Sequence, residues 1–452
     1  MPNQKLSRFT LWACLGASLL LPPGPRLAQA QQGAAPAPNG PLRTWTTSDG
    51  RLFQATYINA DSTRVALRMP DGKTTVLPLK SLGAEDQAFV QTKAKAGAPA
   101  AAPPQNAPNK QPLLAPAQKR IWPEKAIPEE SALNVQQVPE SPSIKGYLYR
   151  SKSFEFNASE KLAGSVIKEI ARTFEATRTL TQVLPWGIQP QPPADFGYYR
   201  AQLYADRAGY LQDGGLKNSG GAYFPRSKIF KVPFESLGLE RRAKTWFKNP
   251  EYNSETIVHE VTHQMMDEFL PFLPIWIIEG TAEYTSMLPF QSGAFACSSH
   301  ERGIKEYVKN YQNRTRSTLF ETSSLSELMA MTLQDWHARS DTGAKDQARL
   351  YFSSCLLVYF FCHLDGDGRG TAFLQYLDQI RAARDAWVSF LNNPEVRRNA
   401  DGTISCPSGM TPPSQARSEA YGLEQGTLLR GNRDEAQLKK QFSEAFKKIG
   451  VR

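Results

Sequence analysis

The chain has 452 residues, which is more than one ordinary domain contains and predicts two or three folded units. Its formal net charge is +10, but basic and acidic residues are interspersed, and no basic block alternates with aromatic residues. This distribution argues against nucleic acid as a partner and leaves weak contact with anionic cell-wall or cell-surface polymers open.

Residues 1–30 are expected to form a secretory signal peptide. Two basic residues precede an apolar stretch at 9–21 that is too short to span a bilayer, and a small-x-small cleavage motif ends at Ala30. Lipidation at Cys14 fits less well, because Trp12 stands where a lipobox needs a small residue. No later apolar run reaches the roughly 20 residues of a membrane helix. We therefore expect an exported protein, periplasmic or extracellular, without an integral membrane segment.

Four cysteines remain after removal of the signal peptide: Cys297, Cys355, Cys362 and Cys406. An even number in an oxidising compartment permits disulfide bonds. Cys355 and Cys362 lie seven residues apart on one expected helix, about 10 Å along its axis, so they cannot bridge each other. Each of these two cysteines either pairs elsewhere or stays a buried thiol.

Residues 43–92 are expected to form a small β-rich domain. Three turn signals separate short runs of β-forming residues. Val65, Leu67 and Met69 recur at every second position, which is the period of a half-buried strand. The pattern predicts a barrel of four or five strands, closed by a short helix near 84–90.

The segments DGRLFQATY, VALRMPDGKTTVLPLKSL and EDQAFV within this region resemble the SLA homology domain, an SH3-like barrel attached to many secreted bacterial proteins. The resemblance implies the fold of the domain and says little about its ligand.

Residues 93–145 are rich in Pro, Ala and Gln and show no hydrophobic period. Such a segment cannot bury enough apolar surface to offset its chain entropy, and its prolines favour extended conformations. We expect a disordered linker that lets the flanking domains move independently.

Residues 146–452 are expected to form one α+β domain in which strands come first and helices follow. A long helix at 159–184 carries apolar residues at helical spacing, and a shorter one is indicated at 206–212. After Leu239 the chain is expected to be almost entirely helical. The strand-like stretches lie at 147–157, 198–205 and 221–234.

The stretch SETIVHEVTHQMMDEF carries His259 and His263 four residues apart, with Glu260 beside the first. On a helix both imidazoles project from one face and can bind a single Zn²⁺ at about 2.0–2.1 Å. Glu260 then lies next to a ligand without being one, where it can contact a metal-bound water. The alternative is an amphipathic helix that carries its histidines by chance.

A third ligand decides between these interpretations. In LPIWIIEGTAEY, Glu279 follows His259 by twenty residues and lies in the next predicted helix. Two histidines and one carboxylate leave a fourth position for water, which is the arrangement of a catalytic zinc site. Glu283 lies one turn further on the same helix face, where it can accept the second ring proton of His259 and fix its tautomer.

HEVTH followed by W-x-x-E-G-x-A-E resembles the gluzincin metallopeptidases, the clan of thermolysin and the aminopeptidase-N-like enzymes, and more narrowly its secreted peptidase-MA-like bacterial members. The resemblance spans roughly residues 199–377. It implies that His259, His263 and Glu279 bind zinc and that Glu260 is the general base.

Aminopeptidase-N-like enzymes have a G-x-M-E-N edge strand before the HExxH motif, and its glutamate holds the free amine of the substrate. The comparable stretch here, NSGGAYFPRSKIF, has the glycines but no acidic residue. Gly220, Gly221, Ala222 and Tyr223 remain candidates for backbone contacts with an extended peptide. The missing amine anchor favours endopeptidase action.

Gluzincins usually supply an oxyanion donor from a later helix, and ARLYFSSCLLVYFF resembles the Y-x-x-S-x-x-L-V segment of the peptidase-MA-like members. Tyr351 is the candidate donor, and the alternative is a tyrosine of the hydrophobic core. His300, His337 and His363 are isolated in the sequence and are expected at the surface. Residues 365–368 (DGDG) indicate a turn that ends a helix, because the later acidic ligands of a calcium loop are missing.

The sequence thus predicts an exported zinc-dependent peptidase that acts on a peptide or protein, with Glu260 moving the proton. One alternative is a non-catalytic zinc-containing protein of the cell surface or wall that acts through its SH3-like domain. A second alternative is a scaffold without metal. Glu260 favours the enzyme, because a structural zinc site has no use for that acid.

Overall fold

The computed structural model describes residues 42–48, 51–60, 64–69, 74–96, 115–139, 145–217, 219–316, 321–398, 404–407, 410, 413 and 428–451. These residues belong to two compact units, and the division falls between 113 and 114. The predicted signal peptide, residues 1–30, lies outside the described residues.

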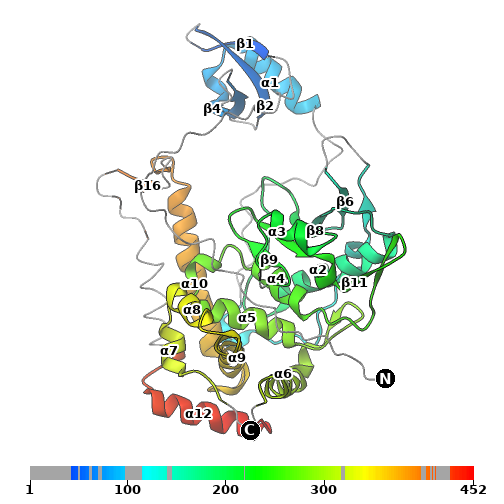
Figure 1. The fold of residues 1–452 in the computed structure, drawn as a ribbon. Helices are drawn as coiled ribbons and strands as arrows, with labels where there is room; N and C mark the ends of the chain where they lie inside the picture. The colour runs from blue at the N-terminus through cyan, green and yellow to red at the C-terminus, as the bar shows by residue number, and fades with distance from the viewer. Residues whose placement is uncertain are drawn as a thin grey trace. The chain divides into compact units, whose positions relative to one another are not determined.

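The N-terminal unit is a four-stranded antiparallel sheet in the order β1-β2-β3-β4, followed by helix α1 (Figure 1). The bounds are Leu42–Thr46 for β1, Leu52–Ala60 for β2, Arg64–Arg68 for β3, Thr74–Pro78 for β4 and Ala84–Ala96 for α1. Val65 and Leu67 are buried and Met69 is partly buried, as the alternation predicts. Together with Trp45 and Val90 the buried pair forms the core of this unit.

The sheet of this unit is open in the part of the chain that the structure describes, because β1 and β4 are not paired with each other. The backbone N–H of Gly83 donates to the Thr46 carbonyl at 2.7 Å, so the segment after β4 returns to the end of β1. Four strands and a following helix agree with the prediction, and closure into a barrel stays a prediction.

The C-terminal unit is built on a six-stranded mixed sheet in the order β5-β6-β7-β8-β10-β9. β7 pairs in parallel with β8 and β8 with β10, while the outer pairs are antiparallel. The strands are β5 (Gln136–Gln137), β6 (Tyr147–Arg150), β7 (Phe154–Ala158), β8 (Tyr199–Tyr204), β9 (Ala222–Phe224) and β10 (Ile229–Pro233). The single strand predicted at 147–157 is therefore a hairpin, whose turn is the polar trio at 151–153.

Helix α2 (Gly164–Val183) connects β7 to β8, and α3 (Arg207–Gln212) follows β8. The prediction placed the start of α2 at Ser159, but the N–H of Ser159 donates to the Leu203 carbonyl at 2.9 Å and so extends the strand pairing. Helix α2 packs against β7 and against α4 (Glu255–Met265), which also contacts β9 and β10.

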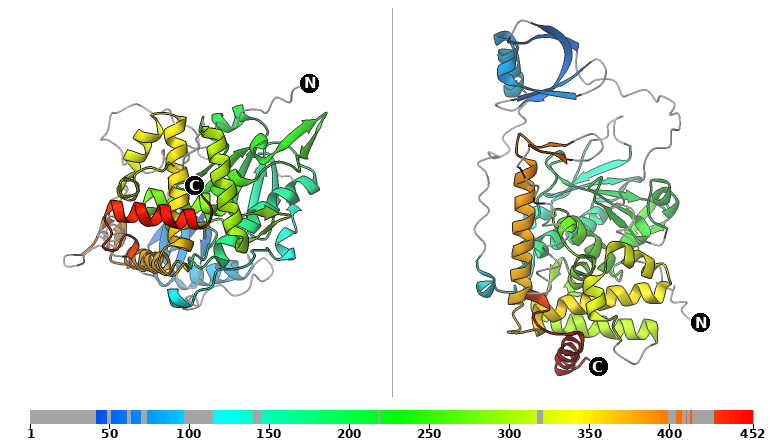
Figure 2. Two further views of the ribbon diagram at one scale, coloured as in Figure 1. Left: turned by 90° about the horizontal axis from the view of Figure 1, so that it is seen from below. Right: turned by 90° about the vertical axis from the view of Figure 1, so that its left-hand side faces the viewer.

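The remaining helices form the other half of the unit, coloured from green through yellow and orange to red in Figures 1 and 2. They are α5 (Ile275–Met287), α6 (His300–Thr315), α7 (Leu325–Ala330), α8 (Leu333–Ser340), α9 (Ala344–Tyr359) with a π-helical turn at Phe360–Leu364, α10 (Thr371–Leu391) and α12 (Glu435–Lys448). Every residue of α5 is buried, because α5 packs between α4 and α9.

The expectation that the chain is almost entirely helical after Leu239 is wrong in three places, where short antiparallel hairpins occur. The strands are β11 (Leu239–Arg242), β12 (Thr245–Lys248), β13 (Phe290–Gln291), β14 (Ala294–Phe295), β15 (Arg397–Arg398) and β16 (Ile404–Ser405). Strands of two to four residues are too short to show a period of two. The whole chain is nevertheless multidomain and mixed α/β, in loose agreement with the predicted fold class.

Residues 115–139, called the strap below, contradict the prediction that the whole of 93–145 is a disordered linker. Arg120 donates to both carboxylate oxygens of Asp378 at 2.6 Å. The Trp122 indole donates to the Arg369 carbonyl at 2.8 Å. Ala126 forms a β-bridge with Phe295, and strand β5 adds to the edge of the sheet. The strap therefore belongs to the C-terminal unit, and the predicted linker extends at most from 97 to 114.

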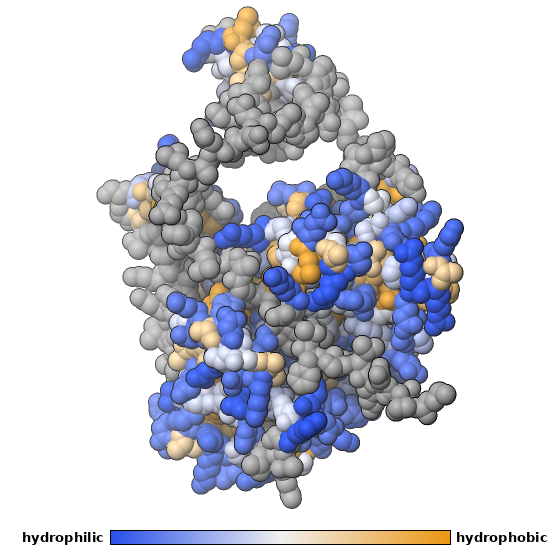
Figure 3. Space-filling view, in the orientation of Figure 1, coloured by the Kyte–Doolittle hydropathy of each residue, from blue (hydrophilic) through white to orange (hydrophobic). Residues whose placement is uncertain are grey.

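Among the described helices, none combines the length and the apolarity that crossing a bilayer requires. Among the coloured residues of the face drawn in Figure 3, hydrophilic ones predominate and the hydrophobic areas are small and separate. The four described cysteines are free, and Cys355 and Cys362 are buried thiols, one of the outcomes that their helical spacing left open.

Candidate metal centre

Helix α4 presents its two histidines toward α5. His259 and His263 are one helical turn apart, and their Nε2 atoms lie 3.0 Å from each other. Thr262, on the same helix, contacts Thr285 of α5 through their hydroxyls at 2.7 Å. This contact and the apolar surroundings fix the spacing between the two helices, so the imidazoles point at one place on α5.

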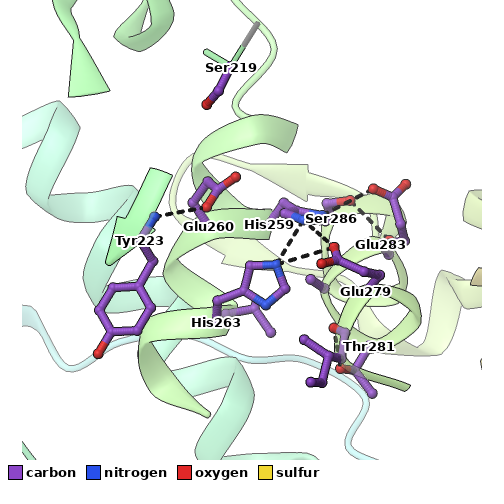
Figure 4. Close-up of polar contacts among 12 residues, drawn as sticks. Ser219, Tyr223, His259, Glu260, His263, Glu279, Thr281, Glu283 and Ser286 are labelled. Carbon is purple, nitrogen blue, oxygen red and sulfur yellow. Dashed lines mark hydrogen bonds and ion pairs between the residues drawn. The ribbon is translucent and has the colours of Figure 1, made fainter. Parts of the chain in front are cut away.

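The carboxylate of Glu279 on α5 lies at that place (Figure 4). Its Oε2 atom is 3.3 Å from the Nε2 of His259 and 3.5 Å from the Nε2 of His263. Ligand atoms about 2.05 Å from a tetrahedral Zn²⁺ lie about 3.3 Å from each other. The three distances within the cluster, 3.0, 3.3 and 3.5 Å, therefore suit three ligands of one ion.

The chemistry of the cluster also fits a cation. His259, His263 and Glu279 are each about 1% exposed, and neither oxygen of Glu279 has a regular hydrogen-bond partner among the described residues. Among the described residues, the ionic contacts of Glu279 are with the imidazoles of His259 and His263. A buried carboxylate is costly unless a positive charge, from a protonated imidazole or from a metal ion, compensates it. These residues form the one group in the described chain whose ligand atoms could hold a metal.

The pKa values within the cluster reflect the same acidic surroundings. Burial favours the neutral imidazole of His259, but the carboxylates of Glu279 and Glu283 outweigh it and raise the pKa of His259 to about 10. Burial likewise opposes ionisation of Glu279, yet the adjacent His263 and His259 lower its pKa to about 2. The centre of the cluster is thus electrostatically suited to a positive charge.

Glu283 lies behind His259, as the sequence predicts. Its Oε1 atom is 3.0 Å from the Nδ1 of His259, which leaves Nε2 directed into the cluster. The hydroxyl of Tyr307 on α6 donates to the other oxygen of Glu283 at 2.6 Å. Tyr307 was missed in the sequence, because it comes from another helix and no motif connects it to the histidines.

Glu260 lies beside the cluster and outside the ligand set. Its Oε2 atom accepts a hydrogen bond from the backbone N–H of Tyr223 at 3.1 Å, and its side chain is about 3% exposed (Figure 4). Tyr223 belongs to β9, the edge strand of the six-stranded sheet. The edge strand β9 therefore holds the Glu260 carboxylate next to the candidate metal ligands.

The predicted segment Gly220, Gly221, Ala222 and Tyr223 leads into this edge strand, which begins at Ala222. The N–H of Gly221 donates to the Ser219 hydroxyl at 3.0 Å. A Cβ at Gly221 would lie 3.1 Å from Val232 and 3.2 Å from the Lys231 carbonyl, so a larger residue would crowd β10. The segment thus lies next to Glu260.

Tyr351 on α9 lies beside the cluster, with its ring centroid 6.2 Å from that of His259. The ring is about 4% exposed and packs edge-on against Trp336 at 5.2 Å. Both earlier interpretations are compatible with this position, because the tyrosine is part of the core and also adjacent to a ligand.

His300 and His363, expected as separate surface residues, instead stack on each other with ring centroids 3.9 Å apart. The Tyr284 hydroxyl lies 2.9 Å from the Nε2 of His363, and the Tyr359 hydroxyl lies 3.0 Å from the Nδ1 of His300. Trp122 of the strap packs on His363 at 4.4 Å. This second cluster is separate from the metal ligands.

The sequence Asp365-Gly366-Asp367-Gly368 is a turn after the π-helical segment, as predicted. Asp365 is paired with Arg433 at 2.7 Å. Asp367 accepts hydrogen bonds from the Arg369 backbone and from the Thr371 hydroxyl. Both carboxylates therefore hold neighbouring chain segments.

No protein-family model, curated protein or solved structure matches this chain. The likeness to the gluzincins consequently rests on the residues and spacings given above, and function has to be argued from the site.

Proposed function

We propose that the protein is an exported zinc-dependent peptidase of the gluzincin type, acting as an endopeptidase on peptides or proteins. The observation that carries the proposal is the cluster of His259, His263 and Glu279, whose ligand atoms lie 3.0–3.5 Å apart with Glu260 held beside them. A purely structural zinc site needs four protein ligands and no adjacent acid. Three ligands and a neighbouring carboxylate favour hydrolysis.

His259, His263 and Glu279 would hold the ion, which when bound supplies Lewis-acid polarisation and lowers the pKa of a water toward about 7. Glu260 takes the proton of the attacking water and passes it to the leaving amine. Tyr351 donates a hydrogen bond to the carbonyl oxygen as negative charge develops there. Glu283 keeps the His259 ring in one tautomer.

The edge of β9 supplies the backbone groups that align an extended peptide beside Glu260. Endopeptidase action is proposed because the stretch from Ser219 to Phe230 contains no acidic residue that could hold a free amine. For the N-terminal unit we propose an SH3-like fold of the SLA homology type, supported by four antiparallel strands in chain order and a following helix.

The proposal is tested by metal analysis and a peptide-cleavage assay on wild type, Glu260→Gln and Glu279→Gln. Wild type should hold one Zn²⁺ per chain and cleave a mixed peptide library. Glu260→Gln should keep its zinc and lose roughly 10²- to 10⁴-fold in rate, as expected for a lost general base. Glu279→Gln should lose zinc affinity, because an amide oxygen is a poorer ligand than a carboxylate.

Three results would speak against the proposal. Zinc-loaded wild type without cleavage favours the non-catalytic zinc protein, and chains purified without metal favour the scaffold. Loss of zinc in Glu260→Gln but not in Glu279→Gln would show that the ligand assignment is wrong.

A further inference from the structure

Two histidines that lie far apart in the sequence meet at the strap. The rings of His300, the first residue of α6, and His363, in the π-helical turn, are nearly parallel, at an interplanar angle of 8° with centroids 3.9 Å apart. Trp122 of the strap packs on His363 at 4.4 Å, and its indole N–H donates to the Arg369 carbonyl at 2.8 Å. The strap is therefore in direct contact with the histidine pair.

Each ring of the pair has a tyrosine as its hydrogen-bond partner. The Tyr284 hydroxyl on α5 lies 2.9 Å from the Nε2 of His363, and the Tyr359 hydroxyl on α9 lies 3.0 Å from the Nδ1 of His300. A neutral imidazole can accept a hydroxyl proton at one ring nitrogen, whereas a protonated imidazole has only donors. Protonation of either ring would therefore require its tyrosine to accept, and the hydroxyl proton would need a new partner.

The stacked arrangement also suits neutral rings better than charged ones. Two positive charges at this distance repel each other, so both rings cannot be protonated while the stack persists. Burial lowers the pKa of His363 and of His300, and the facing His300 ring lowers that of His363 further.

The surroundings of the pair offer little compensation for a proton. On α6, the Glu301 carboxylate opposes the pKa shift of His300. After the π-helical turn, Asp365 is already paired with Arg433 at 2.7 Å. The strap contributes a neutral indole, and α5 and α9 contribute tyrosine hydroxyls. In the part of the chain that the structure describes, a charged His363 would therefore lack a carboxylate partner.

The middle of the strap is attached less firmly than its two ends. At one end Arg120 is paired with Asp378 at 2.6 Å, and at the other end strand β5 is hydrogen-bonded to β6. Between these anchors the strap is held by Trp122 and by backbone hydrogen bonds that join 124 and 126 to residues 295 and 298. The segment 121–127 can therefore open while both ends of the strap stay attached.

This segment also forms part of a cavity wall. Lys125 and Ile127 line a cavity of about 880 Å³ that extends to Val258, the residue before the candidate ligand His259. Opening of 121–127 would therefore widen the entrance to the cavity.

We propose that the His300–His363 pair is a pH-sensitive switch, which holds residues 121–127 closed at neutral pH and releases them when a ring is protonated in acid. Proton uptake separates the two rings, so Trp122 loses its packing partner and the segment leaves the cavity wall. The switch is independent of the proposed peptidase function, because neither histidine of the pair is a candidate metal ligand.

The test is hydrogen–deuterium exchange of full-length wild type at pH 7, 6 and 5, with rates corrected for the intrinsic pH dependence of amide exchange. Protection of a peptide that covers 121–127 should fall by up to about 10-fold per pH unit below about 6.5, because opening takes up one proton. The exchange should not accelerate in urea below the unfolding transition, since local opening exposes little surface. Exchange of β7 through global unfolding should accelerate in urea.

Three variants separate the switch from general acid sensitivity. His363→Gln removes the titrating ring next to the strap, so the protection of 121–127 should lose most of its pH dependence. His337→Gln is the matched control, because it removes a histidine of α8 outside the pair, and it should behave as wild type. Trp122→Phe weakens the contact without altering the pair, so protection should be lower at every pH with the same pH dependence.

Three results would overturn the switch. Protection of 121–127 that stays constant from pH 7 to pH 5 would show that the segment does not respond to protons. The same pH dependence in His363→Gln and in wild type would show that the histidine pair is not the sensor. Exchange of 121–127 that accelerates in urea as steeply as that of β7 would show that the strap opens only when the whole unit unfolds.

Discussion

The Tyr307 hydroxyl contacts the candidate metal centre through one intermediate carboxylate. It donates to Glu283, and Glu283 faces the Nδ1 of His259, so a group on α6 helps to set the direction of a ligand on α4. Such partners of metal ligands commonly contribute 10- to 100-fold to metal affinity or activity.

Replacing Tyr307 with Phe should weaken zinc binding about 10-fold, because one oxygen of the buried Glu283 loses its donor. The measurement is competition for zinc with a chelator of known affinity. Tyr311→Phe is the control, since Tyr311 stacks on the same Phe352 ring one turn later, at 3.7 Å. Equal zinc affinity for both variants and wild type would show that Tyr307 does not contribute to zinc binding.

Gly280 follows the ligand Glu279 at the contact between α5 and α9. A Cβ at this position would lie 2.5 Å from the Ser354 carbonyl oxygen and 2.7 Å from a Val358 methyl group. Because the first of these is a backbone atom of a packed helix, α5 itself would have to move, and it would carry Glu279 away from the histidines.

Gly280→Ala should therefore destabilise the C-terminal unit by about 1–3 kcal/mol, the usual cost of overpacking, and also lower zinc content. Thermal unfolding with and without added zinc measures both effects. Gly164→Ala is the matched control, because nothing lies within 4 Å of its Cβ. That variant should be neutral or slightly stabilising. Unchanged zinc content in Gly280→Ala would show that the helices accommodate the added methyl group without displacing Glu279.

At the scale of elements, the His300–His363 stack joins α6, the π-helical turn and the strap. Burial lowers the pKa of His363 well below its usual value, and the facing His300 lowers it further. Burial also lowers the pKa of His300, with the Glu301 carboxylate opposing. Both rings are thus neutral in the fold at pH values at which an unfolded histidine is already charged.

The sign of the pH effect follows from proton uptake by the unfolded chain. Below the ordinary histidine pKa of about 6.5, the two histidines bind protons in the unfolded state but not in the folded state. The free energy of unfolding therefore decreases as the pH falls from about 6.5. The partly buried His363, whose pKa is lowered furthest, contributes up to about 1.4 kcal/mol per pH unit, and His300 contributes less. Urea unfolding of the C-terminal unit at pH 7, 6 and 5 should show a shallower decline for His363→Gln than for wild type. Parallel declines would contradict this role.

Sequence patterns predicted that His259, His263 and Glu279 lie together, because these residues are on two successive helices and their spacing within each helix determines their direction. They did not locate Tyr307, whose contact depends on how α6 packs against α5. They also misjudged the strap, because its Pro/Ala-rich composition matches that of a linker and its order depends on distant partners such as Asp378. Local period and motif were thus sufficient to bring these three residues together, while the position of Tyr307 and the order of the strap depend on tertiary contacts.

At the scale of the whole molecule, the contacts of the strap narrow the segment in which limited proteolysis is expected. Limited proteolysis should cleave between about 97 and 114, where the composition is Pro/Ala-rich, and spare 115–139, whose backbone is held by the C-terminal unit. N-terminal sequencing and mass spectrometry of the fragments identify the cut. The C-terminal fragment should retain its zinc, and early cleavage within the strap would contradict the observed contacts.

All three proposed metal ligands come from 21 consecutive residues, from His259 to Glu279. The entropy cost of closing a loop rises only with the logarithm of its length, and contacts between near neighbours in the chain form fast. The α4–α5 pair can therefore assemble its ligand set before the distant helices α9, α10 and α12 have docked. Zinc present during folding would bind at this early stage and stabilise the helix pair on which the rest of the unit then packs. The closeness of the three residues in the sequence would therefore determine that metal binding precedes the docking of the later helices.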